Sequence, residues 1–522
     1  MKNFFNKYKN FLLITFLGVF SLVFNFYYGY RGVYPIDSFT TFDSSYNIIL
    51  GNHPFKDYWL ITGPFLNYIQ SLFFLIFGIN WISYVLHAST MNMLLAIFSY
   101  YFFSKIGLNI FYAFIYSLGI SILAYPSIGT PFADHHAVIL SILSMYSLFL
   151  GIFFKKNFFW FITPLLIVFA FFSKQIPAAY IGILFGVVIF YYFFVEKSMS
   201  KKNFLYLCAG FLFSVLLISS VFLINEIPIK NFLTQYIYYP LSLGEKRFSD
   251  LNLDYGNFFG QFKFIFFSLI PLVVSLIIII NKKENKLFKN KNFVIGIIFI
   301  FLVLIFIYFQ LMTLNQILIF SLIPISLAFS HVYIEKYYNK KYLIYFIIIL
   351  FIFSIGKYHI RFNENKKFME LSGVDFNLAV NGNNLDKIFS GLKWITPHYA
   401  NEPEKEIDLL LDSINYLSNV NERKNIITDY QFFSILLKNP FASPNKFYDG
   451  QGIPGKKNKY YNKHKDFFLE KIKTNKIQYL YFVGNNKHEI DFFVDFINEN
   501  ECIESSQINE LLIELNITGC DF

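Results

Sequence analysis

The chain has 522 residues, of which 55% are hydrophobic, 22% are aromatic and only 15% are charged. Soluble domains carry roughly 25% charged residues, so this composition excludes a soluble globular protein and indicates a polytopic membrane protein. The net charge of +10 does not indicate nucleic-acid binding. The Lys residues cluster at the ends of apolar runs, where the positive-inside bias puts them.

Residues 1–29 place basic residues before an apolar stretch, as a signal peptide does, but no small-residue cleavage site follows. We therefore expect an uncleaved first helix. Further apolar runs long enough to cross a bilayer recur along the first two-thirds of the chain. We expect about eleven spans, near residues 11–29, 82–103, 109–124, 136–154, 158–173, 177–195, 204–224, 263–281, 292–310, 313–331 and 342–357.

The apolar run at 64–78 is short for a span, and loop charge decides its placement. If it does not cross, the Lys-rich loops all fall on the side of the N-terminus, with about 17 Lys/Arg there against about six opposite. We therefore expect an in-plane helix at 64–78, a cytoplasmic N-terminus and an extracytoplasmic C-terminus, in the plasma (inner) membrane. Four polar segments then share the outer side: the loop 30–64, 124–136, 172–177 and 225–262.

After Lys357 the composition becomes polar, with a helix-like charged stretch (EKEIDLLLDSINYLSNV) and strand-like ones (KNIITDY, IQYLYFVG) in alternation. This pattern predicts two domains, a membrane domain at 1–357 and an extracytoplasmic α/β domain at 358–522. Cys502 and Cys520 lie in the second domain. An oxidising compartment would permit a disulfide between them, and two free buried thiols are the alternative.

Three acids follow the first span. Asp37 lies close behind it, where a carboxylate can take a proton from an attacking hydroxyl; the alternative is a solvated loop carboxylate or a helix N-cap. Asp43 is either its partner or a first-turn acid of a helix. Asp57 lies among aromatic residues, in a setting that favours a structural role.

Asp134, His135 and His136 begin the fourth span from the outer side. Neighbouring helical residues point about 100° apart, so the two His side chains do not readily share one metal ion. We expect an N-cap with hydrogen bonds from His135 to substrate, and Asp134 is a candidate second acid.

Basic and amide side chains interrupt apolar segments on the same side. Lys174 and Gln175 lie between closely spaced spans, where a cation can bind a lipid phosphate or snorkel to the interface. Lys246 and Arg247 belong to the longest outer loop. Arg suits bidentate phosphate contact, and simple surface exposure is the alternative.

These residues together resemble a family. An acid after the first span is followed by ILGNHPFKDYWLITGPFLNYIQSLFFLIFG, with Asp134 and Lys174-Gln175 further along. The pattern is similar to GT-C glycosyltransferases, and in particular to the polyprenyl-phosphate-sugar-dependent group with protein O-mannosyltransferases and the lipid A aminoarabinose transferase. The resemblance covers roughly residues 10–200, and the rest of the chain fits only in outline.

The resemblance implies a glycosyltransferase that moves a sugar from a polyprenyl-phosphate donor to an envelope glycolipid, glycan or protein, with inversion, outside the cytoplasm. Asp37 would then be the catalytic base and Asp134 a second acid. Lys174, Gln175, Arg247, Asp43 and His135 are the candidate contacts to substrate. Many members have paired acids at the first site, whereas Ser38 follows Asp37 here, so a divalent cation and the role of Asp43 stay open.

Other functions compete with transfer. A transporter or flippase of lipid-linked precursors would place ionisable or broken helices near the bilayer midplane, whereas the polar groups here gather at outer helix ends. A glycan polymerase or ligase also acts on lipid-linked substrates, typically through loops rich in Arg and His. A scaffold without enzymatic activity is a further alternative.

Overall fold

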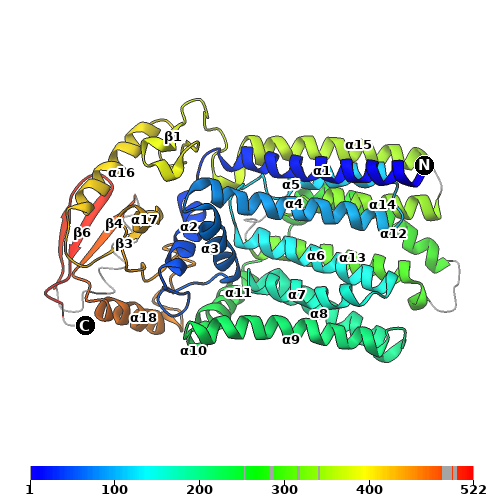
Figure 1. Cartoon of the computed structure of the whole chain (residues 1–522), viewed down its shortest axis with the longest axis horizontal. Helices are drawn as coiled ribbons and strands as arrows, with labels where there is room; N and C mark the ends of the chain where they lie inside the picture. Colours follow the sequence, from blue (N-terminus) through cyan, green and yellow to red (C-terminus); the bar gives the residue numbers. More distant parts are fainter. Residues whose placement is uncertain are drawn as a thin grey trace. The chain divides into compact units, whose positions relative to one another are not determined.

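The computed structural model of the chain is mostly helical (Figure 1). It describes residues 2–251, 253–281, 287–313, 318–338, 341–484, 497 and 502–520. The chain forms two compact units of three segments each. The helical unit consists of Met1–Gly29, Val85–Ser219 and Arg247–Phe368, and the mixed unit of Tyr30–Tyr84, Ser220–Lys246 and Met369–Phe522. The predicted division into domains 1–357 and 358–522 stays a prediction.

The helical unit is built from long apolar helices that run side by side (Figure 1). Its elements, some of which extend into the mixed unit, are α1 (Lys2–Gly29), α4 (Trp81–Lys105), α5 (Ile110–Leu123), α6 (Ala133–Phe154), α7 (Asn157–Phe171), α8 (Gln175–Phe190), η1 (Tyr191–Val195), α9 (Lys201–Ile224), η3 (Gly256–Gly260), α12 (Gln261–Asn281), η4 (Leu287–Lys289), α13 (Lys291–Met312), α14 (Leu322–Tyr337), α15 (Lys341–Tyr358), η5 (His359–Glu364) and η6 (Lys367–Met369).

Eight helices in the described part of the chain are long and apolar enough to cross a membrane. The chain is therefore a multi-pass membrane protein, as its composition predicts. The predicted spans at 109–124 and 158–173 correspond to the shorter apolar helices α5 and α7. The span predicted at 313–331 has the wrong boundaries. The helix α14 begins later, at Leu322, and continues to Tyr337, while residues 314–317 lie outside the described part of the chain.

Pro324 explains where α14 starts. It occupies the first turn of the helix, where the backbone N–H that proline lacks has no partner within the helix anyway.

Buried amide groups connect α1, α4 and α5 inside the helical unit. The Asn92 side-chain amide donates to the carbonyl oxygens of Ser21 (3.1 Å) and Ser121 (2.9 Å). Asn25 in α1 donates to the Ser89 hydroxyl in α4 (2.9 Å). In a nonpolar surrounding these hydrogen bonds fix which faces of the helices meet.

The mixed unit combines helices with a small sheet. Its helical elements are α2 (Pro35–Ile49), α3 (Phe65–Phe77), α10 (Ile229–Phe232), η2 (Leu233–Tyr238), α11 (Tyr239–Ser249, which ends in the helical unit), η7 (Gly382–Asn384), η8 (Lys387–Phe389), α16 (Pro403–Ser418), α17 (Phe433–Leu436) and α18 (Tyr461–Thr474). Its strands are β1 (Val380–Asn381), β2 (Lys393–Trp394), β3 (Lys424–Thr428), β4 (Tyr479–Val483), β5 (Glu504–Gln507) and β6 (Leu512–Asn516).

The main sheet has the strand order β3-β4-β6-β5. Strands β3 and β4 are parallel, with Ile426 opposite Tyr481, and β6 pairs antiparallel with both β4 and β5. The parallel pair requires a crossover, and α18 supplies it between the two strands. The apolar residues of β3 and β4 are buried on both faces of the sheet, as parallel strands usually are.

The loop after the first span is part of the mixed unit. The N–H groups of Gly32 and Val33 donate to the carbonyl oxygens of Lys393 and Ile395, each at 3.0 Å. Phe39 in α2 stacks on Trp394, with 5.8 Å between ring centres. The opening loop therefore shares hydrogen bonds and packing with the C-terminal segment of the chain.

Helix α3 is the apolar run at 64–78. Its 13 residues extend about 20 Å, less than the roughly 30 Å of a bilayer core. Phe74 faces Phe42 of α2, whereas Leu72, Leu75 and Ile76 are exposed. A short helix with one packed face and one exposed apolar face agrees with the predicted in-plane position.

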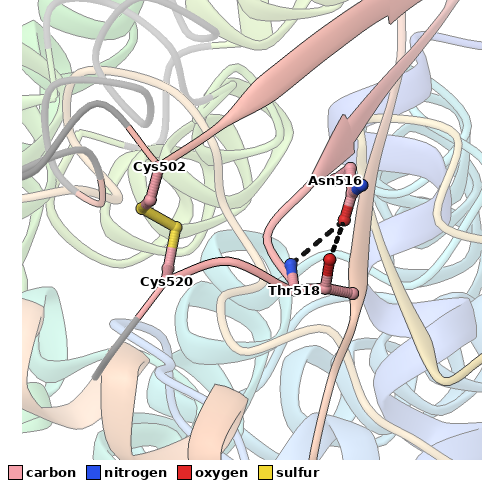
Figure 2. The surroundings of a disulfide bond; sticks show 4 residues. All are labelled: Cys502, Asn516, Thr518 and Cys520. Atoms are coloured by element: carbon pink, nitrogen blue, oxygen red, sulfur yellow. Dashed lines mark hydrogen bonds between the residues drawn. A yellow bond between two sulfur atoms is a disulfide. The ribbon is translucent and has the colours of Figure 1, made fainter.

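A disulfide joins Cys502 and Cys520 (Figure 2). It connects the residues just outside the hairpin of β5 and β6. Beside it, the backbone N–H and the hydroxyl of Thr518 donate to the Asn516 side chain at 3.0 and 2.7 Å. Of the two alternatives for these cysteines, the structure has the disulfide.

Candidate active site

The loop 124–132 and the first turn of α6 bury several polar side chains of the helical unit. The Tyr125 hydroxyl lies 2.5 Å from Nδ1 of His136 and accepts a hydrogen bond from the Phe132 N–H (3.0 Å). Nε2 of His136 lies 3.0 Å from Nε2 of His87 in α4. Both ring nitrogens of His136 are thus engaged, which makes this residue part of the packing between helices.

Two glycines let this loop cross the end of α1. A Cβ atom on Gly129 would lie 2.5 Å from the backbone of Gly29, and the φ of Gly129 is +84°. The side-chain amide of Asn25 donates to the Gly129 carbonyl (3.2 Å) and secures the crossing. The close approach fixes where α6 begins, and with it the position of Asp134.

Asp134 and Lys174, both predicted from the sequence as site residues, are brought together. Asp134 lies in the first turn of α6, and Lys174 caps α8. Nζ of Lys174 lies 3.3 Å from Oδ2 of Asp134, and the Asp134 side chain is 8% exposed against 25% for Lys174. The helix N-terminus favours the carboxylate, while the ammonium keeps access to a ligand.

An apolar groove lies beside Lys174. It has a volume of about 290 Å³ and is lined by apolar residues of α7, α8 and α9, among them Ala178 and Phe211, and by Phe172, which follows α7. Phe172 and Ala178 flank Lys174 and Gln175 in the sequence. The groove thus offers a hydrocarbon-binding surface next to an ammonium group.

The remaining predicted contacts of the helical unit are more dispersed. Gln175 is the half-buried first residue of α8, and His135 is buried with Nε2 3.4 Å from the Ser127 hydroxyl. Arg247 is half-buried and donates to the carbonyl of Met312 at 3.3 Å. Lys246 is an exposed residue of the mixed unit. Their roles toward substrate stay predictions.

Asp37 occupies the first turn of α2 in the mixed unit and is half-buried, with Pro35 starting the helix. Its neighbour Tyr34 donates from its hydroxyl to Glu370 at 3.4 Å. Burial raises the pKa of Tyr34, and the charges of Glu370, Asp37 and Asp429 raise it further. Asp37 is therefore one of three acids whose charges reach the Tyr34 hydroxyl.

Asp43 is buried in an ion pair. Its carboxylate accepts hydrogen bonds from Nζ of Lys446 and from the Ser434 hydroxyl, and the Lys446 and Asp43 side chains are 0% and 2% exposed. The ammonium also lies 4.5 Å from the centre of the Tyr58 ring. Both Asp43 oxygens are engaged within the unit, so the predicted substrate contact has no support in this geometry and stays a prediction.

Asp57, the third acid of the opening loop, accepts a hydrogen bond from the His53 N–H at 2.7 Å. Its neighbour Lys56 pairs with Glu226 at 3.4 Å. These contacts close a turn, in line with the structural role expected from the sequence.

Asp429 and Lys446 are two charged residues that the sequence analysis did not select. Asp429 directly follows β3, at the carboxyl end of a parallel strand pair, which is where α/β sheets place ligand-binding side chains. Burial and, to a lesser extent, the charge of Asp449 raise the pKa of Asp429 from 3.8 to about 7. That strand-end position could have identified Asp429 from sequence, whereas nothing distinguishes Lys446 among its many lysine neighbours.

Within the described ranges, no group of three or more His, Cys, Asp or Glu side chains is arranged to hold a metal ion. Dependence on a divalent cation therefore stays open.

Comparisons with known proteins give a distant likeness in structure. No family model matches the chain, and no curated protein matches its sequence. A solved structure, described as the crystal structure of ArnT from Cupriavidus metallidurans bound to undecaprenyl phosphate, aligns over 96% of this chain and 97% of that chain. The identity is 9% and the TM-score is 0.49. A likeness of that degree carries no inference about activity, so we argue function from the residues of this chain.

Proposed function

We propose that the protein is a membrane glycosyltransferase that moves a sugar from a polyprenyl-phosphate donor to a cell-envelope acceptor on the extracytoplasmic side. The observation that carries this proposal is the ion pair of buried Asp134 and half-buried Lys174, together with an apolar groove lined by the nearby residues Phe172 and Ala178. An ammonium at the end of a hydrocarbon-binding surface matches a lipid whose head group is a phosphate. The resemblance of residues 10–200 to GT-C enzymes supports the same reading.

In the proposed reaction the acceptor hydroxyl attacks the anomeric carbon, and a new C–O bond forms as the bond from that carbon to the phosphate oxygen breaks. The polyprenyl phosphate leaves with the electron pair, and attack from the opposite face inverts the configuration. Asp37 takes the proton of the hydroxyl as general base. Lys174 stabilises the charge on the departing phosphate, with Gln175 and Arg247 as further candidate contacts.

The proposed orientation has two supports. Loop charges favour a cytoplasmic N-terminus. The disulfide of Cys502 and Cys520 suits an oxidising compartment, such as the outer side of a plasma membrane. With this orientation, Asp37, Asp134 and Lys174 all face outward.

Mass spectrometry of envelope glycolipids, glycans and glycoproteins tests the proposal in a deletion strain that carries the gene or its variants. We expect one sugar to be missing in the deletion strain. Lys174→Gln and Asp37→Asn should lower transfer about 10²-fold or more at equal protein levels. Asp412→Asn, a change at an exposed position of α16, serves as the control and should restore the sugar fully. An unchanged glycome in the deletion strain would favour a transporter or scaffold instead.

A further inference from the structure

Three buried polar atoms near the start of α6 have no hydrogen-bond partner among the residues that the structure describes. They are Oδ1 of Asp134, Nδ1 of His135 and Oγ1 of Thr130. The three residues are 6%, 4% and 2% exposed, and they lie within six positions of one another in the chain. Buried polar atoms are normally hydrogen-bonded, so this local group of exceptions requires an explanation.

Loose packing does not explain them, because neighbouring side chains are hydrogen-bonded. Tyr125, His136 and Asn25 all make hydrogen bonds in the same region, at 2.5 to 3.2 Å. The other oxygen of Asp134 has Lys174 as its partner. The same junction thus satisfies some polar groups internally and leaves these three atoms without a partner among the described residues.

The chemistry of the three atoms indicates what that group is. A carboxylate oxygen only accepts hydrogen bonds, so Asp134 requires a donor. The phosphate that links a polyprenyl chain to a sugar is ionised and donates none. Thr130 can donate or accept, and so can Nδ1 of His135, depending on its tautomer. Hydroxyl groups, which do both, match all three positions.

We propose that Thr130, Asp134 and His135 form a hydroxyl-binding subsite for the sugar of the lipid-linked donor, next to a phosphate held by Lys174. This inference rests on the proposed function and adds to it the residues that select a glycosylated lipid over a bare polyprenyl phosphate. A site built around polar partners discriminates strongly, because a ligand without hydroxyls leaves those partners unpaired.

Isosteric changes separate recognition from folding. Thr130→Val and His135→Phe remove the unpaired atoms and keep the approximate shape of each side chain. Thr130→Val deletes only a buried polar atom without a partner, so it should leave the melting temperature unchanged or raise it. His135→Phe also removes Nε2, which lies 3.4 Å from the Ser127 hydroxyl, so its melting temperature is measured beside its lipid binding. Ser141→Ala is the matched control: its hydroxyl is also buried without a partner among the described residues, but two turns deeper in α6.

The test is native mass spectrometry of the purified full chain in nanodiscs with two probes. One probe is undecaprenyl phosphate, and the other is the total lipid extract of a strain from which the gene has been deleted. We expect the wild type to bind undecaprenyl phosphate and to take a glycosylated polyprenyl phosphate from the extract. Thr130→Val and His135→Phe should bind undecaprenyl phosphate as the wild type does and the glycosylated lipid about ten-fold more weakly, while Ser141→Ala should match the wild type for both.

Three other results would overturn the inference. Variants that bind the glycosylated lipid as well as the wild type would mean that the three atoms hold ordered water only. A wild type that binds undecaprenyl phosphate but no glycosylated lipid would leave the phosphate site intact and exclude the sugar subsite. A wild type that binds neither lipid would refute the proposed function itself.

Discussion

Asp43 and Asp429 are two carboxylates of the mixed unit with opposite electrostatic surroundings. Asp43 faces the ammonium of Lys446 and the hydroxyl of Ser434. Asp429 has another acid, Asp449, as its charged neighbour, and its Oδ1 atom has no hydrogen-bond partner in the part of the chain that is described. The first arrangement gives a buried carboxylate a counter-charge, whereas the second raises the pKa of Asp429.

Removal of one partner from the buried pair should destabilise the mixed unit strongly. Lys446→Met leaves the Asp43 carboxylate buried without a counter-charge, which costs about 3–5 kcal/mol. Hydrogen exchange of peptides from β3 and β4 in the purified full chain measures the loss of protection. The double variant Asp43→Leu/Lys446→Met should recover most of the protection against exchange, because this variant leaves no unpaired charge.

A surface pair of the same unit provides the control. Lys405 and Glu510 lie 2.8 Å apart, with 46% and 62% of their side chains exposed. Lys405→Met should therefore change the protection of these peptides very little. Equal losses from Lys446→Met and Lys405→Met would contradict the assignment of a buried ion pair.

Asp429 should make the stability of the mixed unit depend on pH. Its folded-state pKa is raised from 3.8 to about 7, so the folded protein binds this proton more tightly than the unfolded chain does. The stabilisation is complete below about pH 4 and is lost as the pH rises through 7. Thermal unfolding between pH 5 and 8 should show a melting temperature that falls with rising pH.

Asp429→Asn should reduce that fall and stabilise the unit at pH 8 by about 2–4 kcal/mol. Some dependence of the melting temperature on pH should remain, because burial also raises the pKa of Glu406. The variant Asp412→Asn, at an exposed position, should show the same dependence of melting temperature on pH as the wild type. If Asp429→Asn also shows the wild-type dependence, the assignment of a raised pKa to Asp429 is wrong.

At the scale of residues, the sequence predicted individual site residues better than it predicted which residues interact. Asp134 was selected because it begins a span on the outer side, and Lys174 because it interrupts an apolar region, and the two do meet. Asp43 was selected as well, but its partner lies 403 positions away. No local pattern connects the two, so only the folded chain reveals that Asp43 is buried.

At the scale of elements, the crossing of the loop 124–132 with α1 depends on two glycines. Gly129→Ala would bring a Cβ atom to 2.5 Å from the backbone of Gly29 at a φ of +84°. We expect a loss of several kcal/mol, well above the roughly 1–2 kcal/mol of positive φ alone. Thermal unfolding of the purified protein measures this loss.

Gly107 is the matched control within the helical unit. Its φ is +109°, but a Cβ atom there would meet nothing within 4 Å. Gly107→Ala should thus report the backbone strain without the clash. Melting temperatures that fall equally in both variants would show that the crossing with α1 is not tight.

Elements with a strong periodic pattern were the predictable ones. The strand-like stretches KNIITDY and IQYLYFVG contain β3 and β4, and the charged helix predicted after residue 403 is α16. Strands β5 and β6 were not predicted, because β5 is a polar, fully exposed edge strand without alternation. The predicted start of the span at 313–331 was wrong, since hydropathy alone does not mark where a helix begins.

At the scale of the whole molecule, the proposed orientation predicts which loops a reagent can reach. In a Cys208→Ser background, Ser418→Cys in α16 should react with a membrane-impermeant maleimide in intact cells. Ser200→Cys, just before α9, should react only after permeabilisation. Both positions are exposed, so a difference in labelling reflects sidedness. The reverse pattern would invert the topology.

The division into units has a consequence for synthesis. The ribosome produces the segment 30–84 early, but the Lys446 that neutralises Asp43 follows 403 residues later. At 5–20 residues per second, the delay is roughly 20–80 s. During this time the nascent chain carries an unneutralised acid and an unpacked aromatic helix, α2, while the intervening spans are inserted. The early segment therefore needs protection from aggregation and proteolysis until the end of translation, and a ribosome that stalls before residue 446 yields a chain that cannot complete this unit.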